Sequence, residues 1–311
     1  MINLKYQQNT TEQLLAILIQ HRRVSEQVKS QCQGTQCQGC TQSPRQHIEY
    51  AVTRQLPLTM ILPAFPAKSA NRDKTLSEKP DLGEIMGLQN LNVLCETLQD
   101  IHQPGVCLII CSDGRVFNDL VSVSDQDVDI YQQGIKDIIK EHRLRHLSTF
   151  SLDDIYPYRD YNSMRDLLMR QFGESLQELT DRIQTDDQAH HQFNGIHRFI
   201  MEDQLALYPS LSRNQVRKQA KPVAYEVIRR SNAWSRLLAD YFPHGLRLSI
   251  HPQLCGSEKL GINFLPATNH WATPWHNVLL KNEQGWQLIK RRDAEQLGAI
   301  LRDNHYVLET R

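Results

Sequence analysis

The 311-residue sequence lacks any excess of charge, because its 35 lysines and arginines are matched by 35 aspartates and glutamates. Proteins that bind nucleic acid usually carry a basic excess or a basic stripe, so this balance argues against that class. The sequence has no run of 18 apolar residues, and its first residues, MINLKYQQNTTEQ, are too polar for a secretory signal peptide. We therefore expect a cytoplasmic protein that neither crosses a membrane nor binds nucleic acid.

Several catalytic signatures are also missing. The sequence contains no G-x-G-x-x-G after an early strand, no Walker A motif, no G-x-S-x-G elbow and no H-E-x-x-H. These motifs are typical of nicotinamide-dependent enzymes, nucleotide-binding enzymes, serine hydrolases and zincin metalloproteases, so the sequence gives no support for those classes. Asp125, Asp127 and Asp129 resemble a calcium loop, but Ile130 stands where the loop requires glycine and Lys136 where it requires glutamate. Calcium is therefore excluded, and no metal is expected in the active site.

Cysteine is scarce, yet three of the seven cysteines, Cys32, Cys37 and Cys40, lie within nine residues. The spacing C-x4-C-x2-C matches the first three ligands of a plant-type iron–sulfur motif. It also suits a zinc site completed by Cys95, Cys255 or a histidine. The Gln- and Gly-rich surroundings lack hydrophobic residues to shield a cluster. They favour a flexible linker with free thiols, while the two metal alternatives remain open.

The order of the predicted elements indicates an α/β fold. The apolar runs Leu58–Leu62 and Val106–Cys111 are typical of buried parallel strands. A capping box at Ser124 begins a helix that continues to about His142, and a strand follows at His146–Ser151. Strand, helix and strand in this order predict a Rossmann-like open sheet in the front half of the chain.

Helices dominate the middle of the sequence and strands its end. The remaining predicted helices are Thr11–Val28 (with Thr10 or Thr11 as N-cap), His47–Gln55, Asn90–Ile101, Ser163–Ile183, Ala189–Leu207 and Ser212–Phe242. The late strands are expected at Leu246–Ile250, Gly261–Leu265, His276–Lys281 and Trp286–Lys290. The full prediction is a Rossmann-like sheet with a helical middle section and a β-rich C-terminal part.

A basic loop follows the strand Leu58–Leu62. It begins at two prolines and places Lys68, Arg72 and Lys74 within seven residues, beside small residues that let a ligand approach. Fixed cationic donors at a strand end suit a phosphate, because they need little reorganisation to bind it. The alternative is an ordinary solvated basic loop.

Other candidate site residues lie at strand ends. Asp113 and Arg115 directly follow Val106–Cys111, and ligands of open α/β sheets bind at such ends. His251 ends a predicted strand and His276 follows Thr-Pro-Trp, so both are candidates for proton exchange near neutral pH. An Asp-Gly turn with a surface arginine, and two structural histidines, are the alternatives.

Two further cations are candidate ligand contacts. Arg229 lies in the helical stretch VIRRSNAWS, and Lys259 follows a Gly-Ser turn. An exposed face of an amphipathic helix would explain Arg229 equally well, and Lys259 could be an ordinary loop lysine.

Four blocks of the sequence resemble one family of enzymes. LPAFPAKS, CSDGRVFNDLVSVSDQDV, RLSIHPQ and TPWHNV occur here in the order found in the isocyanide (isonitrile) synthases of the pyoverdine/dityrosine biosynthesis family. The resemblance covers roughly Leu56 to Glu295. It implies a catalytic domain at residues 45–311, preceded at residues 1–44 by an N-terminal helix and the Cys/Gln-rich linker.

The resemblance implies a lyase-type reaction in secondary metabolism. The α-amino group of an aromatic L-amino acid, with tyrosine favoured over tryptophan, would become an isonitrile whose carbon comes from C2 of ribulose 5-phosphate. Formaldehyde, hydroxyacetone and phosphate would be released. No metal or organic cofactor is implied, since ribulose 5-phosphate is a co-substrate. An iron/2-oxoglutarate oxygenase is the implied pathway partner.

The resemblance and the chemistry together suggest roles for the candidates. We expect His251 and His276 to act as acid and base, with Asp113 or Glu84 as partner. The expected binding residues for the sugar phosphate and the amino-acid carboxylate are Lys68, Arg72, Lys74, Arg115, Arg229 and Lys259. Two alternatives from other classes are a non-catalytic module that binds a phosphorylated metabolite and a metal or redox protein organised by the three clustered cysteines.

Overall fold

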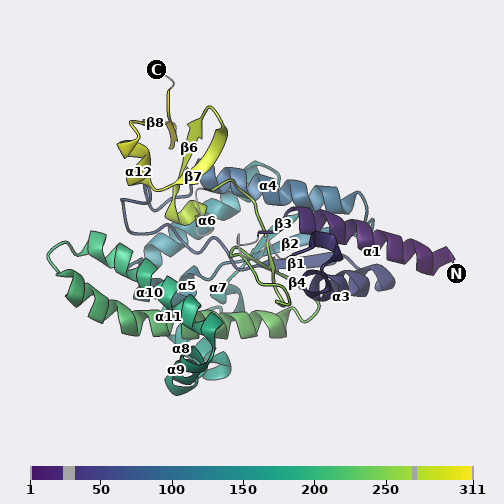
Figure 1. The fold of residues 1–311 in the computed structure, drawn as a ribbon, viewed down its shortest axis with the longest axis horizontal. Helices are drawn as coiled ribbons and strands as arrows, with labels where there is room; N and C mark the ends of the chain where they lie inside the picture. The colour runs from purple at the N-terminus through teal and green to yellow at the C-terminus, as the bar shows by residue number, and fades with distance from the viewer. Residues whose placement is uncertain (1, 24–31, 268–271, 310–311) are drawn as a thin grey trace.

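The computed structural model describes residues 2–23, 32–267 and 272–309, and a five-stranded sheet lies at its centre (Figure 1). The strand order is β3-β2-β1-β4-β5, and every neighbouring pair is parallel. The bounds are β1 Leu58–Leu62, β2 Val106–Cys111, β3 Leu147–Phe150, β4 Leu246–Ser249 and β5 Leu260–Gly261. The Rossmann-like α/β fold predicted from the sequence is confirmed, and β1 and β2 have the predicted bounds.

Apolar residues on both faces of the strands bury the sheet between two layers of helices. On one face, Met60 and Leu108 belong to a core with α1 (Ile2–Gln20), α3 (Gln38–Arg54), α4 (Leu82–Gln99) and α6 (Asp125–Glu141). On the other face, Ile61 and Cys111 pack with Trp234 and Leu237 of α11 (Arg213–Tyr241) and with α8 (Tyr161–Phe172). Burial on both faces explains the continuous apolar runs of β1 and β2.

The helix α6 confirms the predicted capping box, since Ser124 and Asp127 exchange side-chain hydrogen bonds with each other's backbone. The helix α4 starts earlier than predicted, at Leu82, because Asp81 caps it and Glu84 completes a second capping box. Two short helices, α5 (Gly114–Phe117) and α7 (Leu152–Ile155), follow β2 and β3 and were not predicted.

The N-terminal segment differs from its prediction. The helix α1 begins at Ile2, so Thr10 and Thr11 are buried within it and neither is an N-cap. Residues 24–28 of the predicted helix lie outside the described residues. The predicted linker is structured from Cys32 onward, with the short helix η1 (Gly34–Gln36) followed by α3. Leu14 and Leu18 of α1 belong to the same core as the sheet.

The helical middle section contains four helices where three were predicted: α8, α9 (Leu176–Thr185), α10 (Asp187–Leu207) and α11. The predicted helix Ser163–Ile183 breaks at Gly173, whose backbone is extended. A side chain there would meet the carbonyl oxygen of Met169, because a Cβ atom would lie 2.3 Å from it. Ser175 then caps α9.

The C-terminal part forms a separate four-stranded sheet of order β7-β6-β9-β8 beside α4 (Figure 1). Its elements are β6 Val278–Asn282, β7 Gly285–Ile289, α12 Arg291–Gln296, β8 Ile300–Arg302 and β9 His305–Val307. The strand predicted at His276–Lys281 starts at Val278, since His276 ends the short helix η3 (Pro274–His276). β8, β9 and α12 were not predicted. None of the described helices is long and apolar enough to cross a membrane.

Candidate active site

A cavity of about 760 Å³ lies at the carboxyl edge of the parallel sheet. The chain leaves β1 toward β2 on one side, while β4 pairs with β1 on the other, so the strand order changes direction between β1 and β4. Residues that follow β1, β2 and β4 all line the cavity. Such switch points are where open α/β sheets bind ligands. The volume falls within the range typical of small-molecule sites.

The loops after β1 and β2 are held close together at this edge. Ser112 donates a hydrogen bond to the carbonyl oxygen of Phe65 at 3.0 Å. Gly114 faces Pro66, and a Cβ atom there would lie 2.0 Å from the carbonyl oxygen of Pro66, so only glycine allows this approach. Phe65 itself has a φ of 55°, an unfavourable conformation for a bulky residue and one often found at functional sites.

Asp113 is the strongest candidate for proton exchange. It directly precedes α5, but its side chain makes no capping hydrogen bond, and the residue lines the cavity. Burial raises the pKa of Asp113 to about 7, against smaller opposing contributions from its own backbone and from the charge of Lys259. A carboxyl group with this pKa both accepts and donates a proton at neutral pH.

His251 and His276 also line the cavity, as predicted, but they do not titrate near neutral pH. Burial, together with the charges of Arg23 and Lys259, lowers the pKa of His251 to about 4. Burial and the charges of Lys74 and Lys68 hold the pKa of His276 well below its usual value. Both imidazoles are therefore neutral at pH 7, where each offers a hydrogen-bond donor and an acceptor.

Lys68 lines the cavity, but two carboxylates hold its ammonium group. Its Nζ lies 2.7 Å from Asp81 Oδ2 and 2.9 Å from Glu84 Oε2, and it donates to the carbonyl oxygen of Pro274 at 3.0 Å. Although burial opposes its charge, the two acids raise the pKa of Lys68. The predicted phosphate ligand is thus the centre of a buried ion cluster that fixes the basic loop.

Glu84 belongs to this cluster and is absent from the cavity lining. It accepts hydrogen bonds from the backbone of Asp81 and from the hydroxyl of Tyr131, both at 2.9 Å. Burial raises the pKa of Glu84 to about 7, although the charge of Lys68 opposes this shift. The arrangement makes Glu84 a support for Lys68 rather than a partner of the histidines.

The other two cations of the basic loop have different positions. Lys74 lines the cavity, where its Nζ lies 2.6 Å from Asp203 Oδ1, 3.3 Å from Glu202 Oε2 and 4.2 Å from the centre of the Phe199 ring. Arg72 is exposed, pairs with Glu78 at 3.3 Å and does not line the cavity. Of these two cations, the loop therefore brings only Lys74 to the cavity.

The remaining predicted binding residues lie outside the cavity lining. Arg115 is fully buried, where it pairs with Asp125 and Asp129 and stacks on Tyr161. Arg229 pairs with a glutamate one turn earlier on α11. Lys259 donates to Ser235 at 2.9 Å, and burial lowers its pKa to about 8. Lys259 acts on the site through its charge, which lowers the pKa of both Asp113 and His251.

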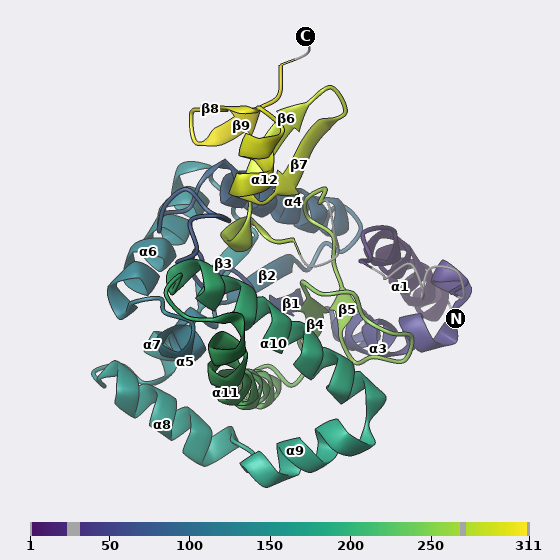
Figure 2. The same ribbon diagram turned by 60° about the vertical axis from the view of Figure 1, so that its left-hand side comes forward.

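The sequence reasoning missed the contribution of α10, which lies in front of the sheet in Figure 2. His191, Asn194, Arg198 and Glu202 of this helix line the cavity. They recur at intervals of three or four residues and so share one face of the helix, but polar residues such as His190 and Gln192 on other faces left that stripe without a distinct signal in the sequence. Arg198 is exposed and forms no ion pair with any described residue.

Apolar side chains form the rest of the cavity wall. Phe117, Ile196, Phe199, Val227 and Trp275 contribute from α5, α10, α11 and η3. Trp275 packs on Phe65, with ring centres 5.1 Å apart. The cavity thus joins a polar end at the strand termini to an apolar wall large enough for an aromatic group.

Several known proteins similar in sequence to this chain are named isonitrile synthases. The family model described as "Pyoverdine/dityrosine biosynthesis protein" matches residues 48–300. An L-tryptophan isonitrile synthase of Fischerella ambigua is 40% identical, with 96% of this chain and 91% of that protein covered. The L-tyrosine isonitrile synthase of Pseudomonas aeruginosa is 35% identical, with 96% and 94% covered.

The fold matches the same group of proteins. The crystal structure of the PvcA protein from Pseudomonas aeruginosa superimposes with a TM-score of 0.89 at 34% identity, covering 96% of this chain and 99% of that one. Sequence and structure agree over nearly the whole chain, which therefore belongs to the pyoverdine/dityrosine biosynthesis protein family.

Proposed function

We propose that the protein is an isocyanide synthase that converts the α-amino group of an aromatic L-amino acid into an isonitrile. In this proposal C2 of ribulose 5-phosphate supplies the isonitrile carbon, and formaldehyde, hydroxyacetone and phosphate leave in a lyase-type reaction. Membership of the family supports the activity. The observation that carries the proposal is the convergence of Asp113, His251 and His276 on one cavity.

Proton transfer falls to Asp113 in this mechanism. The amine must lose protons before it attacks the ketone of the sugar, and the resulting carbinolamine must gain a proton to expel water. A group with a pKa of about 7 serves both steps. The neutral imidazoles of His251 and His276 then orient the substrates and accept hydrogen bonds, and the reaction proceeds without a metal or organic cofactor.

The cations around α10 hold the sugar phosphate. Arg198 has no ion pair among the described residues, so its guanidinium is available for a bidentate contact with a phosphate. Lys74 and Lys290 line the same cavity, and both pair with Glu202. A bound phosphate takes over part of the role of the Glu202 carboxylate, because it also carries negative charge and pairs with the same two ammonium groups.

The apolar wall receives the amino-acid side chain. Phe117, Phe199 and Trp275 offer ring faces and edges to an aromatic group. The relatives include both tryptophan and tyrosine enzymes, so the preference for tyrosine stays a prediction. An iron/2-oxoglutarate oxygenase that processes the isonitrile remains the proposed pathway partner.

The test is incubation of the purified protein with ribulose 5-phosphate labelled with ¹³C at C2, together with equal amounts of tyrosine and tryptophan. A tetrazine probe captures the isonitrile, and mass spectrometry identifies the product. We expect one labelled carbon per product, with tyrosine favoured. Folded protein that binds the sugar phosphate yet yields no isonitrile, either from these two or from a mixture of all the amino acids, would support a binding module instead.

A further inference from the structure

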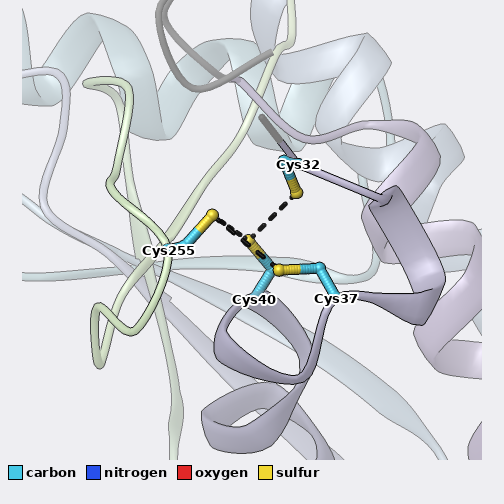
Figure 3. A group of neighbouring side chains, drawn as sticks. All are labelled: Cys32, Cys37, Cys40 and Cys255. Carbon is cyan, nitrogen blue, oxygen red and sulfur yellow. Dashed lines mark hydrogen bonds between the residues drawn. The ribbon is translucent and has the colours of Figure 1, made fainter. Parts of the chain in front are cut away.

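We propose that Cys32, Cys37, Cys40 and Cys255 bind one structural Zn²⁺ ion. Figure 3 shows their four sulfur atoms turned toward one another, three from the N-terminal segment and one from the loop between β4 and β5. All four sulfurs lie within 4.8 Å of one another. This site lies apart from the cavity, whose lining includes none of the four cysteines.

The spacing of the sulfurs fits a single tetrahedral ion. The Sγ–Sγ distances are 3.5 Å for Cys32 and Cys40, 3.8 Å for Cys37 and Cys255, and 3.2 Å for Cys40 and Cys255. Four thiolates at about 2.3 Å from zinc lie about 3.8 Å apart at the corners of a tetrahedron. The three distances differ from that spacing by about 0.6 Å or less.

A binuclear iron–sulfur cluster fits this spacing less well. It divides its four cysteines between two irons with bridging sulfides between them, so the two pairs must stand further apart. Four sulfurs within one 4.8 Å group leave room for one ion. Among ions that favour four thiolates in a tetrahedron, zinc is the usual structural choice.

The local backbone prepares the thiolates for a cation. Cys37 is the residue that caps α3 and Cys40 lies in its first turn, where the helix dipole favours negative charge. Both Nη atoms of Arg22 lie 3.2 Å from Cys32 Sγ. The guanidinium offsets part of the net charge of −2 that four thiolates and one Zn²⁺ carry.

A glycine allows the two chain segments to meet. Gly39, between Cys37 and Cys40, accepts a backbone hydrogen bond from Gly256 at 2.9 Å. A Cβ atom on Gly39 would lie 3.1 Å from the Gly256 nitrogen and 3.4 Å from Cys255 Cβ. The glycine in the C-x-G-C sequence therefore lets Cys255 approach the other three sulfurs.

The ion would fix the strand end that carries His251. Cys40 and Cys255 are 215 residues apart in sequence, and Cys255 lies four residues after His251. Arg23, the last residue of the described stretch that contains α1, also donates a hydrogen bond to the carbonyl oxygen of Ile250 at 2.6 Å. Closing so long a loop through a metal stabilises the folded chain and holds the β4–β5 loop in place.

Elemental analysis of the protein purified under reducing conditions tests the proposal. We expect about one equivalent of zinc, lost in Cys255→Ser and retained in the matched control Cys107→Ser. Cys255 is the exposed member of the group, so its replacement spares the buried core. Circular dichroism verifies that both variants fold. Cobalt exchanged into the wild-type protein should give the visible bands of a tetrahedral thiolate site, and Cys255→Ser should not.

Stability provides a second readout that is independent of catalysis. A strong chelator should lower the Tm of the wild type and of Cys107→Ser but leave Cys255→Ser unchanged. Iron in place of zinc, two disulfides, four free thiols in metal-free reduced protein, or zinc retained by Cys255→Ser would each overturn the proposal. Because metal content is measured directly, failure here differs from failure of the isocyanide synthase assignment.

Discussion

Burial raises the pKa of two carboxyl groups near this site to the same value, although their surroundings differ. Glu84 and Asp113 both have their pKa raised to about 7. The carboxylate of Glu84 is enclosed by Lys68 and Tyr131, whereas Asp113 faces the cavity. The same shift therefore belongs to a structural support at Glu84 and to the proposed proton-transfer group at Asp113.

The first prediction concerns Asp113→Asn. It should lower turnover by roughly 100-fold or more, because general acid–base groups contribute on that order. As a base Asp113 works in its charged form, so kcat/KM of the wild type should rise with pH up to about 7 and then level off. Initial rates from pH 5 to 9 provide the measurement, with the exposed Asp137→Asn as control.

The free energy of unfolding should fall over the pH range in which kcat/KM rises. The folded state binds the Asp113 proton more tightly than the unfolded state, so this residue lowers stability as pH rises from about 4 to about 7. Asp113→Asn removes that loss, and its free energy of unfolding at pH 8 should equal or exceed that of the wild type. A variant that retains full turnover across the pH range would refute the proposed role.

At the scale of elements, the sequence predicted the bounds of the central strands better than it predicted which lysines and arginines would face a ligand. β1 and β2 matched to the residue because apolar runs bounded by turns mark buried parallel strands. Asp113 and His251 line the cavity because the carboxyl ends of parallel strands meet at one edge of such a sheet, whereas His276 reaches it from η3, outside that sheet. Nothing local to Lys68 or Arg115 showed that distant acids would pair with them.

Other features depended on tertiary contacts. From the sequence alone, the face of α10 that includes Arg198 cannot be distinguished from an ordinary solvated helix face. Only the position of the helix over the sheet shows that this face lines the cavity. Cys255 could be named only as one of several completing ligands, because 215 residues separate it from Cys40. The break at Gly173 follows from the packing of one helical turn, which periodicity alone does not reveal.

The second prediction concerns α10. Arg198→Ala should raise KM for ribulose 5-phosphate by roughly 10- to 100-fold, because a hydrogen bond to a charged group contributes about 1.5–3 kcal/mol. KM for the amino acid should change little. Steady-state kinetics with each substrate varied in turn provide the measurement. Arg213→Ala, an exposed arginine at the start of α11, is the matched control. Equal effects on both substrates would contradict a phosphate contact.

At the scale of the whole molecule, the cavity joins three parts of the fold. The strand-end loops of the parallel sheet provide Asp113 and His251, and α10 provides Arg198. The C-terminal part provides His276, just before β6, and Lys290, just after β7. A ligand that contacts all three parts binds the assembled fold and has no equivalent site in the unfolded chain.

The last prediction is that ribulose 5-phosphate stabilises the protein more than ribulose does. At about a hundredfold excess over Kd, a ligand specific for the folded state adds about 2.7 kcal/mol. For a chain of this size we expect Tm to rise by roughly 5 °C. Thermal unfolding should compare ribulose 5-phosphate, ribulose and inorganic phosphate in the wild type and in Arg198→Ala. Ribulose 5-phosphate should raise the Tm of the wild type more than ribulose or inorganic phosphate does. It should raise the Tm of Arg198→Ala less than that of the wild type. An equal response to ribulose would mean that the cavity does not recognise the phosphate group.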